Sequence, residues 1–494
     1  MNIRASGILM HISSLPSPYG IGTFGEEAYK FVDFLEQSGQ KYWQILPIGP
    51  TGFGDSPYQS FSTFAGNPYF IDINHLIEEG LVSNDEAVLY DCGQNPNKVN
   101  FGLLYVKRFK LLKTAFKKRT SIYNVKLNNF KQMNKDWVID YALFMALKEY
   151  FKGKPWFLWD DDIKHRNTES LKNYKEILGN EIEFWIFTQY IFFKQWNKLK
   201  EYANSKGIEI IGDIPIYVAH DSSDVWVNPE MFELDERLNP KIVAGCPPDA
   251  FSATGQLWGN PIYKWGEMEK DDYSWWLKRI SSCSKMYDII RIDHFRGFDS
   301  FYAIPASDKT AENGEWRNGP GIKFFNILKS KLGDIKIIAE DLGFLTESVR
   351  KLRSDTGYPG MKILQFAFDS REESDYLPHN YEKNCIVYTG THDNDTCVGW
   401  FKSISPEDKA FCKKYLGLRN DNKIAYTMIK TAWASVADTA IAPFQDFLNL
   451  DSSARMNMPS TLGGNWEWRV SENVFNNRLS NEIKTITKIY GRLK

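Results

Sequence analysis

Eight short apolar runs recur along the chain, and each ends in polar residues or glycine before a longer amphipathic stretch begins. Near-continuous apolar runs of this length are typical of strands that are buried on both faces. Because these strands alternate with predicted helices, the pattern predicts a parallel sheet covered by helices. The predicted strands are Gly7–Ser13, Tyr42–Ile48, Glu209–Ile216, Tyr287–Asp293, Ile335–Glu340, Lys362–Phe368, Cys385–Thr389 and Thr439–Pro443.

The number of strands favours a closed α/β fold. Eight strand–helix units fit a (β/α)8 TIM barrel, and one catalytic domain over residues 1–494 agrees with the size of that fold. An open doubly wound sheet remains an alternative. Against it, no G-x-G-x-x-G follows the first strand, so the usual dinucleotide-binding signature of such sheets is missing.

Two long segments interrupt the alternation of strands and helices. The segment at about 76–205, between the second and third predicted strands, is rich in helix formers and is predicted to be an inserted helical subdomain. A second insertion at about 221–282 contains a loop punctuated by proline and glycine at 246–261. Long loops over the C-terminal face of a barrel usually serve binding, so this loop is a candidate lid.

Acidic residues stand where several predicted strands end. Asp293 and Glu340 close the fourth and fifth strands, and Asp393 follows the seventh. Any one of them could instead cap the next helix or pair with an arginine. The C-terminal ends of barrel strands form the active site of this fold, and a buried acid is costly without a partner. Three acids at one barrel mouth therefore indicate a shared catalytic purpose.

Two of these carboxyl groups suit cleavage of a glycosidic bond with retention, which needs an acid and a nucleophile about 5 Å apart. Asp293 is the better nucleophile, because Arg291 lies two residues back on the same face and favours the ionised form. Glu340 is the better acid, because the apolar run before it raises its proton affinity. This chemistry requires neither a metal ion nor a cofactor.

Further polar residues complete the predicted site. Asp393 could stabilise the positively charged transition state, with His392 and His294 as partners for sugar hydroxyls. Asp395 is a rival for the role of Asp393. Asp213, on the third strand, is predicted to orient Arg291 and not to act on the substrate.

The charge balance, the apolar runs and the cysteines argue against several classes of function. Sixty basic and sixty-two acidic residues leave a net charge of -2, and no block of Lys and Arg suggests a nucleic-acid partner. The chain shows neither a signal peptide nor about 18 consecutive apolar residues, so we expect a cytoplasmic protein without membrane contact. The six cysteines include no C-x-x-C pair, which predicts buried thiols and neither a zinc site nor a disulfide framework.

Nine characteristic strings follow one another along the chain: SGILMHISSLPSPYGIG, SPYQSFSTFAGNP, GDIPIYVAHDSSDVW, PPDAFSATGQLWGNP, RIDHFRG, IAEDLG, YPGMKILQFAF, GTHDNDT and NMPSTLGGNWEWR. In these strings the chain resembles the 4-α-glucanotransferases of glycoside hydrolase family 77, called amylomaltases or disproportionating enzymes, which are relatives of the α-amylases. The resemblance runs essentially from end to end, and the order of so many strings is highly specific.

The resemblance implies the same three catalytic residues, with a nucleophile in RIDHFRG, an acid/base in IAEDLG and a transition-state stabiliser in GTHD. It also implies that Tyr58 contacts sugar and that Asp249 and Trp258 belong to a lid over the bound glucan. The chain departs from the commoner family residues at Met458–Thr461, Lys362 and Cys246, none of which is a catalytic carboxylate.

The implied activity is transfer of α-1,4-glucan segments from a donor to a maltooligosaccharide or glucose acceptor. An α-1,4-glucan hydrolase is the main alternative, because hydrolysis shares every step up to the covalent intermediate. Transfer is favoured by the family and by an aromatic lid that limits water. A carbohydrate-binding protein without activity conflicts with the three intact acids, and a phosphate-binding barrel enzyme lacks a glycine-rich loop after its late strands.

Overall fold

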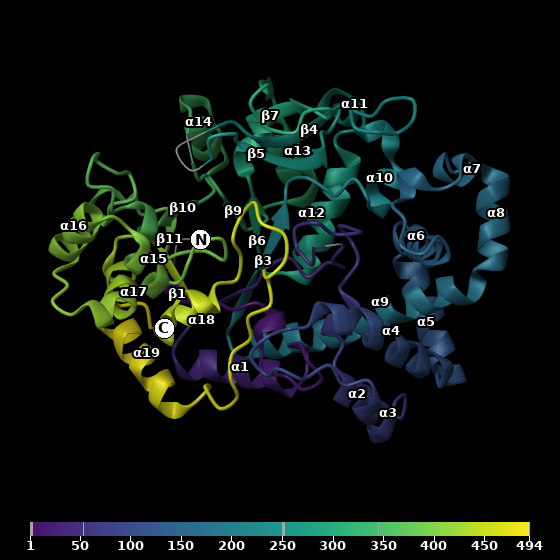
Figure 1. Cartoon of the computed structure of the whole chain (residues 1–494), viewed down its shortest axis with the longest axis horizontal. Coiled ribbons are helices and arrows are strands. Elements are labelled where there is room, and N and C mark those ends of the chain that lie inside the picture. Colours follow the sequence, from purple (N-terminus) through teal and green to yellow (C-terminus); the bar gives the residue numbers. More distant parts are fainter. Residues whose placement is uncertain (1–2, 53, 249–251, 344, 494) are drawn as a thin grey trace.

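Eight parallel strands form the centre of the molecule in a computed structural model that describes residues 3–52, 54–248, 252–343 and 345–493. Their order in the sheet is β10-β11-β12-β1-β2-β3-β6-β9, which follows the chain around a ring (Figure 1). The N–H of Ala339 donates to the oxygen of Pro359 at 3.0 Å and links β9 to β10 across the remaining gap. The strands are β1 (Ala5–Leu9), β2 (Tyr42–Gln44), β3 (Glu209–Pro215), β6 (Ile289–Asp293), β9 (Ile337–Ala339), β10 (Gly360–Ile363), β11 (Cys385–Tyr388) and β12 (Thr439–Pro443).

The predicted TIM barrel is therefore confirmed, and each observed strand overlaps or directly adjoins its predicted run. Aliphatic side chains such as Ile8, Ile211 and Ile441 are completely buried in these strands. Burial on both faces explains why the runs are continuously apolar.

Helices surround the barrel (Figure 1). The first and last of them, α1 and α19, contact each other. These helices are α1 (Glu26–Gln37), α9 (Gly179–Ser205), α12 (Ser274–Met286), α13 (Gly321–Leu332), α14 (Glu347–Thr356), α15 (Cys397–Ser403), α16 (Pro406–Leu416), α17 (Ile424–Ala434), α18 (Phe444–Phe447) and α19 (Asn477–Ile489).

The chain between β2 and β3 is helical and extends to the right of the barrel in Figure 1. Its last helix, α9, contacts α1 and β3 as well as α4, α5, α6 and α8, so it joins the helical region to the barrel. The other helices here are α2 (Ile73–Glu78), α3 (Asn84–Leu89), α4 (Phe101–Lys117), α5 (Ser121–Met133), α6 (Val138–Tyr150), α7 (Asp161–Lys164) and α8 (Thr168–Ile177).

A second, antiparallel sheet lies beside the barrel and was not predicted. Its order is β5-β4-β7-β8, so segments that follow β3 and β6 combine in it. The candidate lid loop 246–261 includes the end of β4 and the whole of β5. The strands are β4 (Ile242–Cys246), β5 (Gln256–Pro261), β7 (Ser300–Pro305) and β8 (Glu315–Asn318), and the short helices α10 (Ser223–Val227) and α11 (Trp265–Glu269) lie near them in the chain.

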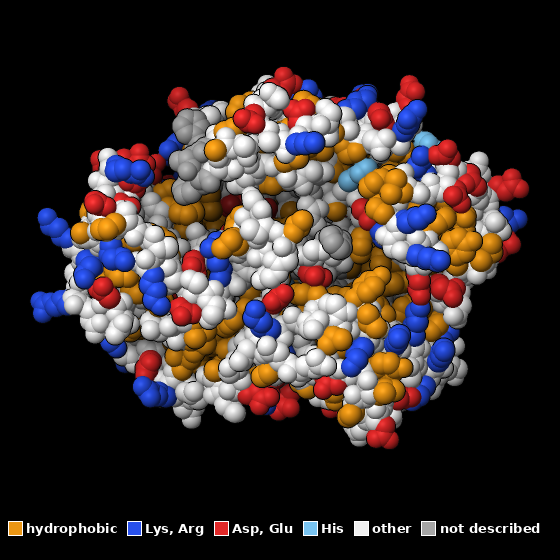
Figure 2. Space-filling view, in the orientation of Figure 1, with side chains coloured by type: hydrophobic (Ala, Val, Ile, Leu, Met, Phe, Trp, Pro, Cys, Tyr) orange, Lys and Arg blue, Asp and Glu red, His pale blue; other side chains and the backbone are white. Residues whose placement is uncertain are grey.

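On the face shown in Figure 2, basic and acidic side chains are interspersed, and apolar side chains gather in the central hollow. No helix among the described residues combines the length and the apolar character that crossing a membrane demands.

Candidate active site

Arg291 lies at the centre of a cluster of charged side chains at the end of the barrel strands. Strand pairing places it opposite Asp213 of β3, and its Nη1 donates to Asp213 Oδ2 at 2.5 Å. Its Nη2 lies 3.2 Å from Asp293 Oδ1 and 3.6 Å from Glu340 Oε1. Arg291 and Asp213 are buried, whereas the carboxyl groups of Asp293 and Glu340 keep partial exposure. The buried guanidinium group of Arg291 therefore holds two acids whose carboxyl groups remain accessible to solvent.

Asp293 and Glu340 come from neighbouring strands. Asp293 ends β6, Glu340 follows β9, and these two strands pair in parallel. Because one nitrogen of Arg291 contacts both carboxyl groups, they face a common point. This arrangement suits a retaining pair, in which one acid attacks carbon and the other moves a proton.

The electrostatics of this pair differ in one respect from the expectation that Arg291 keeps Asp293 ionised. Burial raises the pKa of Asp293 well above its usual range, the neighbouring Glu340 adds to the rise, and Arg291 opposes it. Two carboxyl groups that share one arginine nitrogen as a neighbour disfavour a double negative charge. The rise falls on Asp293, the predicted nucleophile, so Arg291 opposes its protonation without keeping its pKa in the usual range.

His294 turns the chain directly after Asp293. Its backbone is left-handed, with φ at 53°, and its N–H donates to the carboxylate of Glu340. The ring of Trp258 meets the His294 ring edge-on with centroids 4.7 Å apart. Burial lowers the pKa of His294 to about 4, so the imidazole is neutral, and its Nε2 has no hydrogen-bond partner. That nitrogen is available to a sugar hydroxyl.

Tyr58 reaches the cluster from the loop after β2. Its hydroxyl donates to Asp213 Oδ2 at 2.9 Å, and its ring stacks on His392 with centroids 5.1 Å apart. Burial raises the pKa of Tyr58, so the hydroxyl stays protonated and donates. The loop is held by Asp224, which accepts bonds from the N–H and the hydroxyl of Thr63 at 2.9 and 2.8 Å.

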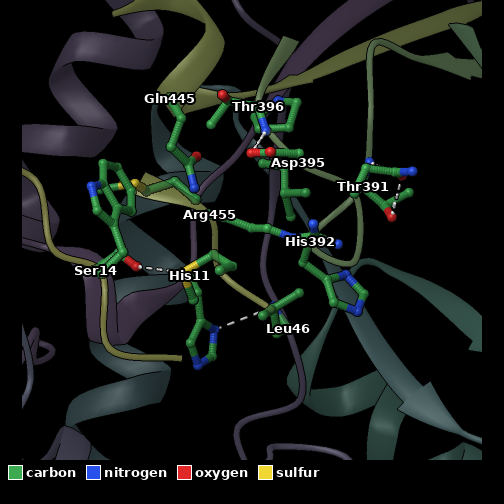
Figure 3. Close-up of a pocket in the computed structure, with 15 residues that line it drawn as sticks. His11, Ser14, Leu46, Thr391, His392, Asp395, Thr396, Gln445 and Arg455 are labelled. Carbon is green, nitrogen blue, oxygen red and sulfur yellow. Dashed lines mark hydrogen bonds between the residues drawn. The ribbon is translucent and has the colours of Figure 1, made fainter. Parts of the chain in front are cut away.

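Asp393 lies in the loop after β11, and two residues from a distant segment hold it. Asn457 Nδ2 donates to Asp393 Oδ1 at 2.6 Å, and Arg455 Nη2 donates to the backbone oxygen of Asp393 at 2.7 Å. His392 Nε2 lies 3.4 Å from the same carboxylate oxygen. Figure 3 shows His392 and Arg455 approaching from these two segments. Neither Arg455 nor Asn457 was predicted, although Asn457 begins the string NMPSTLGGNWEWR.

The rival acid Asp395 has a different environment. Its carboxylate accepts bonds from the Ser452 hydroxyl at 2.6 Å and from the Thr396 N–H at 2.7 Å. These bonds tie down the loop, so the geometry favours Asp393 over Asp395 for contact with the substrate. Asp249 lies outside the described residues. Among those described, no group of three or more His, Cys, Asp or Glu side chains is arranged to bind a metal ion.

Comparison with known proteins decides the family. A sequence profile described as 4-alpha-glucanotransferase matches residues 10–474, nearly the whole chain. The chain belongs to the 4-alpha-glucanotransferase family. A 4-alpha-glucanotransferase of Clostridium butyricum is 54% identical over 98% of this chain and 100% of the relative. One from Streptococcus pneumoniae serotype 4 is 49% identical over 100% of this chain and 98% of the relative.

The fold agrees with this assignment. The solved amylomaltase of Streptococcus agalactiae in complex with acarbose has a TM-score of 0.97 and 47% identity, covering 99% of this chain and 100% of that one. Membership of the 4-alpha-glucanotransferase family means that the enzyme transfers α-glucan segments, and the hydrolase alternative is not favoured.

Proposed function

We propose that Asp293 is the nucleophile of this 4-alpha-glucanotransferase. Its carboxylate attacks the anomeric carbon of a glucose unit in the donor chain, and the bond from that carbon to the leaving oxygen breaks. The product is a covalent glycosyl-aspartate. The proposal is supported by the position of Asp293 at the end of β6, partly exposed and within 3.2 Å of Arg291.

Glu340 moves the proton in both halves of the reaction. It donates to the leaving oxygen when the donor is cut, and it takes the proton of an acceptor 4-hydroxyl, which then displaces Asp293 from the sugar. Two inversions at one carbon give net retention of the α-linkage. The observation that carries this assignment is the contact of Arg291 Nη2 with both acids.

Asp393, His392 and His294 stabilise the transition state through the hydroxyls of the reacting sugar. Asp393 is held by Asn457 while its side chain remains about half exposed, so one carboxylate oxygen stays available. The ring of Tyr58 stacks on the ring of His392, and the ring of Trp258 packs edge-on against the ring of His294. We place Asp249 in the same lid from its sequence position alone.

The substrates that we propose are α-1,4-glucans and maltooligosaccharides as donors, with glucose or maltooligosaccharides as acceptors. The similarity to a solved amylomaltase in complex with acarbose supports an oligosaccharide ligand in this cleft. An aromatic lid favours transfer because it holds an acceptor while limiting water. A cytoplasmic location and the lack of nucleic-acid partners stay predictions from the sequence, and cell fractionation tests the location.

Incubation with maltotriose alone tests the proposal. Transfer produces glucose together with chains longer than maltotriose, whereas hydrolysis produces only glucose and maltose. Asp293→Asn and Glu340→Gln should each lower turnover by several orders of magnitude and leave thermal unfolding unchanged. Near-normal turnover in either variant would contradict the role of that residue.

A further inference from the structure

The loop that carries His392 and Asp393 is anchored at both ends by one buried residue. Thr389 stands directly after β11, before this loop, and Cys397 follows the loop as the first residue of α15. Both contact Asp446, which lies in α18 directly after β12 and is almost completely buried. Figure 3 shows Gln445, the neighbour of Asp446, on the side of the loop away from His392.

The two oxygens of Asp446 accept three hydrogen bonds. The Thr389 hydroxyl donates to Oδ2 at 2.6 Å, and the backbone N–H of Cys397 donates to Oδ1 at 2.8 Å. The Cys397 thiol also donates to Oδ2 at 3.1 Å. A carboxylate is an acceptor at both oxygens, so Asp446 holds the end of a strand and the start of a helix in one fixed relation.

Between these anchors the loop has its own bonds. Asn394 Oδ1 accepts bonds from the N–H and the hydroxyl of Thr391 at 2.8 and 2.9 Å. Gln365 Nε2 donates to the backbone oxygen of Asp395 at 2.8 Å. With its ends fixed and its interior bonded, the loop has little freedom, and the position of Asp393 depends on where the ends are held.

We propose that Asp446 is a positioning residue for catalysis, which sets the place of Asp393 by binding both ends of its loop. This inference rests on the proposed role of Asp393. Asp446 does not contact the substrate and takes no part in the proton transfer. A displacement of about 1 Å at a catalytic group lowers turnover by about 100-fold, so such a clamp has a kinetic effect beyond stability.

Asp446→Asn tests the clamp with little change in volume. Asparagine has one acceptor oxygen, which can still take the Cys397 N–H, but the Thr389 hydroxyl must then turn to accept from the amide, and the Cys397 thiol loses its acceptor. We expect kcat for maltotriose to fall by about 10- to 100-fold with KM changed less than about threefold, because an interaction specific to the transition state is weakened. Thr389→Val should act in the same direction, and Thr389→Ser, which keeps the hydroxyl, should restore most of the activity.

A double-mutant cycle separates positioning from a structural role. If Asp446 acts through Asp393, then Asp446→Asn changes kcat by less than about twofold in an Asp393→Asn background. Equal loss in both backgrounds would overturn the inference and leave the proposed function intact. Normal turnover in Asp393→Asn alone would overturn the role of Asp393, and this inference with it.

Asp438→Asn provides the matched control. Asp438 is a buried acid directly before β12, at the opposite end of the strand that leads to Asp446. We expect this variant to lower thermal stability at most and to leave kcat unchanged. Should Asp446→Asn fail to fold, the Thr389→Val and Thr389→Ser pair carries the same test, and equal activity of these two variants would contradict the clamp.

Discussion

Arg291 is the cation that contacts both acids of the catalytic pair. Its guanidinium lowers the pKa of Asp293, against the effects of burial and Glu340. Removing the charge in Arg291→Met therefore raises the pKa of Asp293 further, and less of the ionised nucleophile is present at a given pH. We expect the acidic limb of the profile of kcat/KM against pH to move to higher pH.

Arg291→Lys keeps a positive charge and should move the limb less than Arg291→Met. Arg279 supplies the control, since it is a buried arginine that donates to the backbone oxygens of Pro215 and Ile216 and contacts neither acid. Arg279→Met should lower stability without moving the limb. A limb that stays in place in Arg291→Met contradicts the electrostatic role of this residue.

Tyr58 combines a hydrogen bond and a ring contact, and substitutions separate the two. Tyr58→Phe removes the bond to Asp213 but keeps the stack on His392. A hydrogen bond to a charged group contributes about 1.5–3 kcal/mol to stability, so we expect Tyr58→Phe to lower the free energy of unfolding by about this amount with little change in KM. Tyr58→Ala also loses the ring and should raise KM. Steady-state kinetics that give the same KM for both variants would contradict a role of the ring in binding.

The sequence allowed prediction of Asp293 and Glu340 as a pair because both end apolar strands that are neighbours in a barrel. Arg455 and Asn457 could not be predicted in the same way. They hold Asp393 from a segment far along the chain, without regular secondary structure, and their contact depends on the tertiary path of that segment. The raised pKa of Asp293 likewise depends on burial, which spacing in the sequence does not provide.

At the scale of elements, a partly buried ion pair joins the helical region to the segment that follows β3. Lys148 of α6 donates to Asp221 Oδ2 at 2.6 Å, and the Trp156 N–H donates to the other oxygen at 3.1 Å. Removing Lys148 leaves the Asp221 carboxylate without its cation in a site that water reaches only in part, which lowers stability. We expect Lys148→Met to lower the midpoint of thermal unfolding, and Lys148→Met with Asp221→Asn to recover part of the loss.

An exposed ion pair between α4 and α6 offers the comparison. Lys113 pairs with Glu149 of α6, and both side chains are more than a third exposed. Exposed pairs contribute little, so Lys113→Met should barely change the unfolding midpoint. If Lys113→Met and Lys148→Met lowered the unfolding midpoint equally, the Lys148–Asp221 pair would stabilise the fold no more than an exposed pair does.

The second sheet shows which elements the apolar pattern misses. Strand β8, with the sequence EWRN, is exposed along its length, and β5 alternates between partly buried and exposed residues before ending in buried ones. Neither forms an apolar run, because each is stabilised by pairing with a neighbour and not by burial on both faces. The eight barrel strands, which are buried, were all predicted.

At the scale of the whole molecule, the thiols report on folding. Five of the six cysteines are buried, and burial raises the pKa of Cys283 to about 11 and those of Cys385 and Cys412 to about 12. Thiols react as thiolates, so these groups are unreactive at neutral pH while the protein is folded. We expect a thiol reagent at pH 8 to label no more than the half-buried Cys246 in the native enzyme and all six cysteines in denaturant. Rapid labelling of several thiols without denaturant would contradict the packing described here.

The barrel closes between the two ends of the chain, and this has a consequence for synthesis. Strand β1 pairs with β12, and Arg492 donates to the backbone oxygens of Ala5 and Asp438 at 2.8 and 3.1 Å. On the ribosome, one edge of β1 therefore lacks its partner until β12, more than 400 residues later, has been translated. An unpaired apolar edge invites association with other chains. The nascent enzyme thus depends on protection of its first strand until β12 has been made.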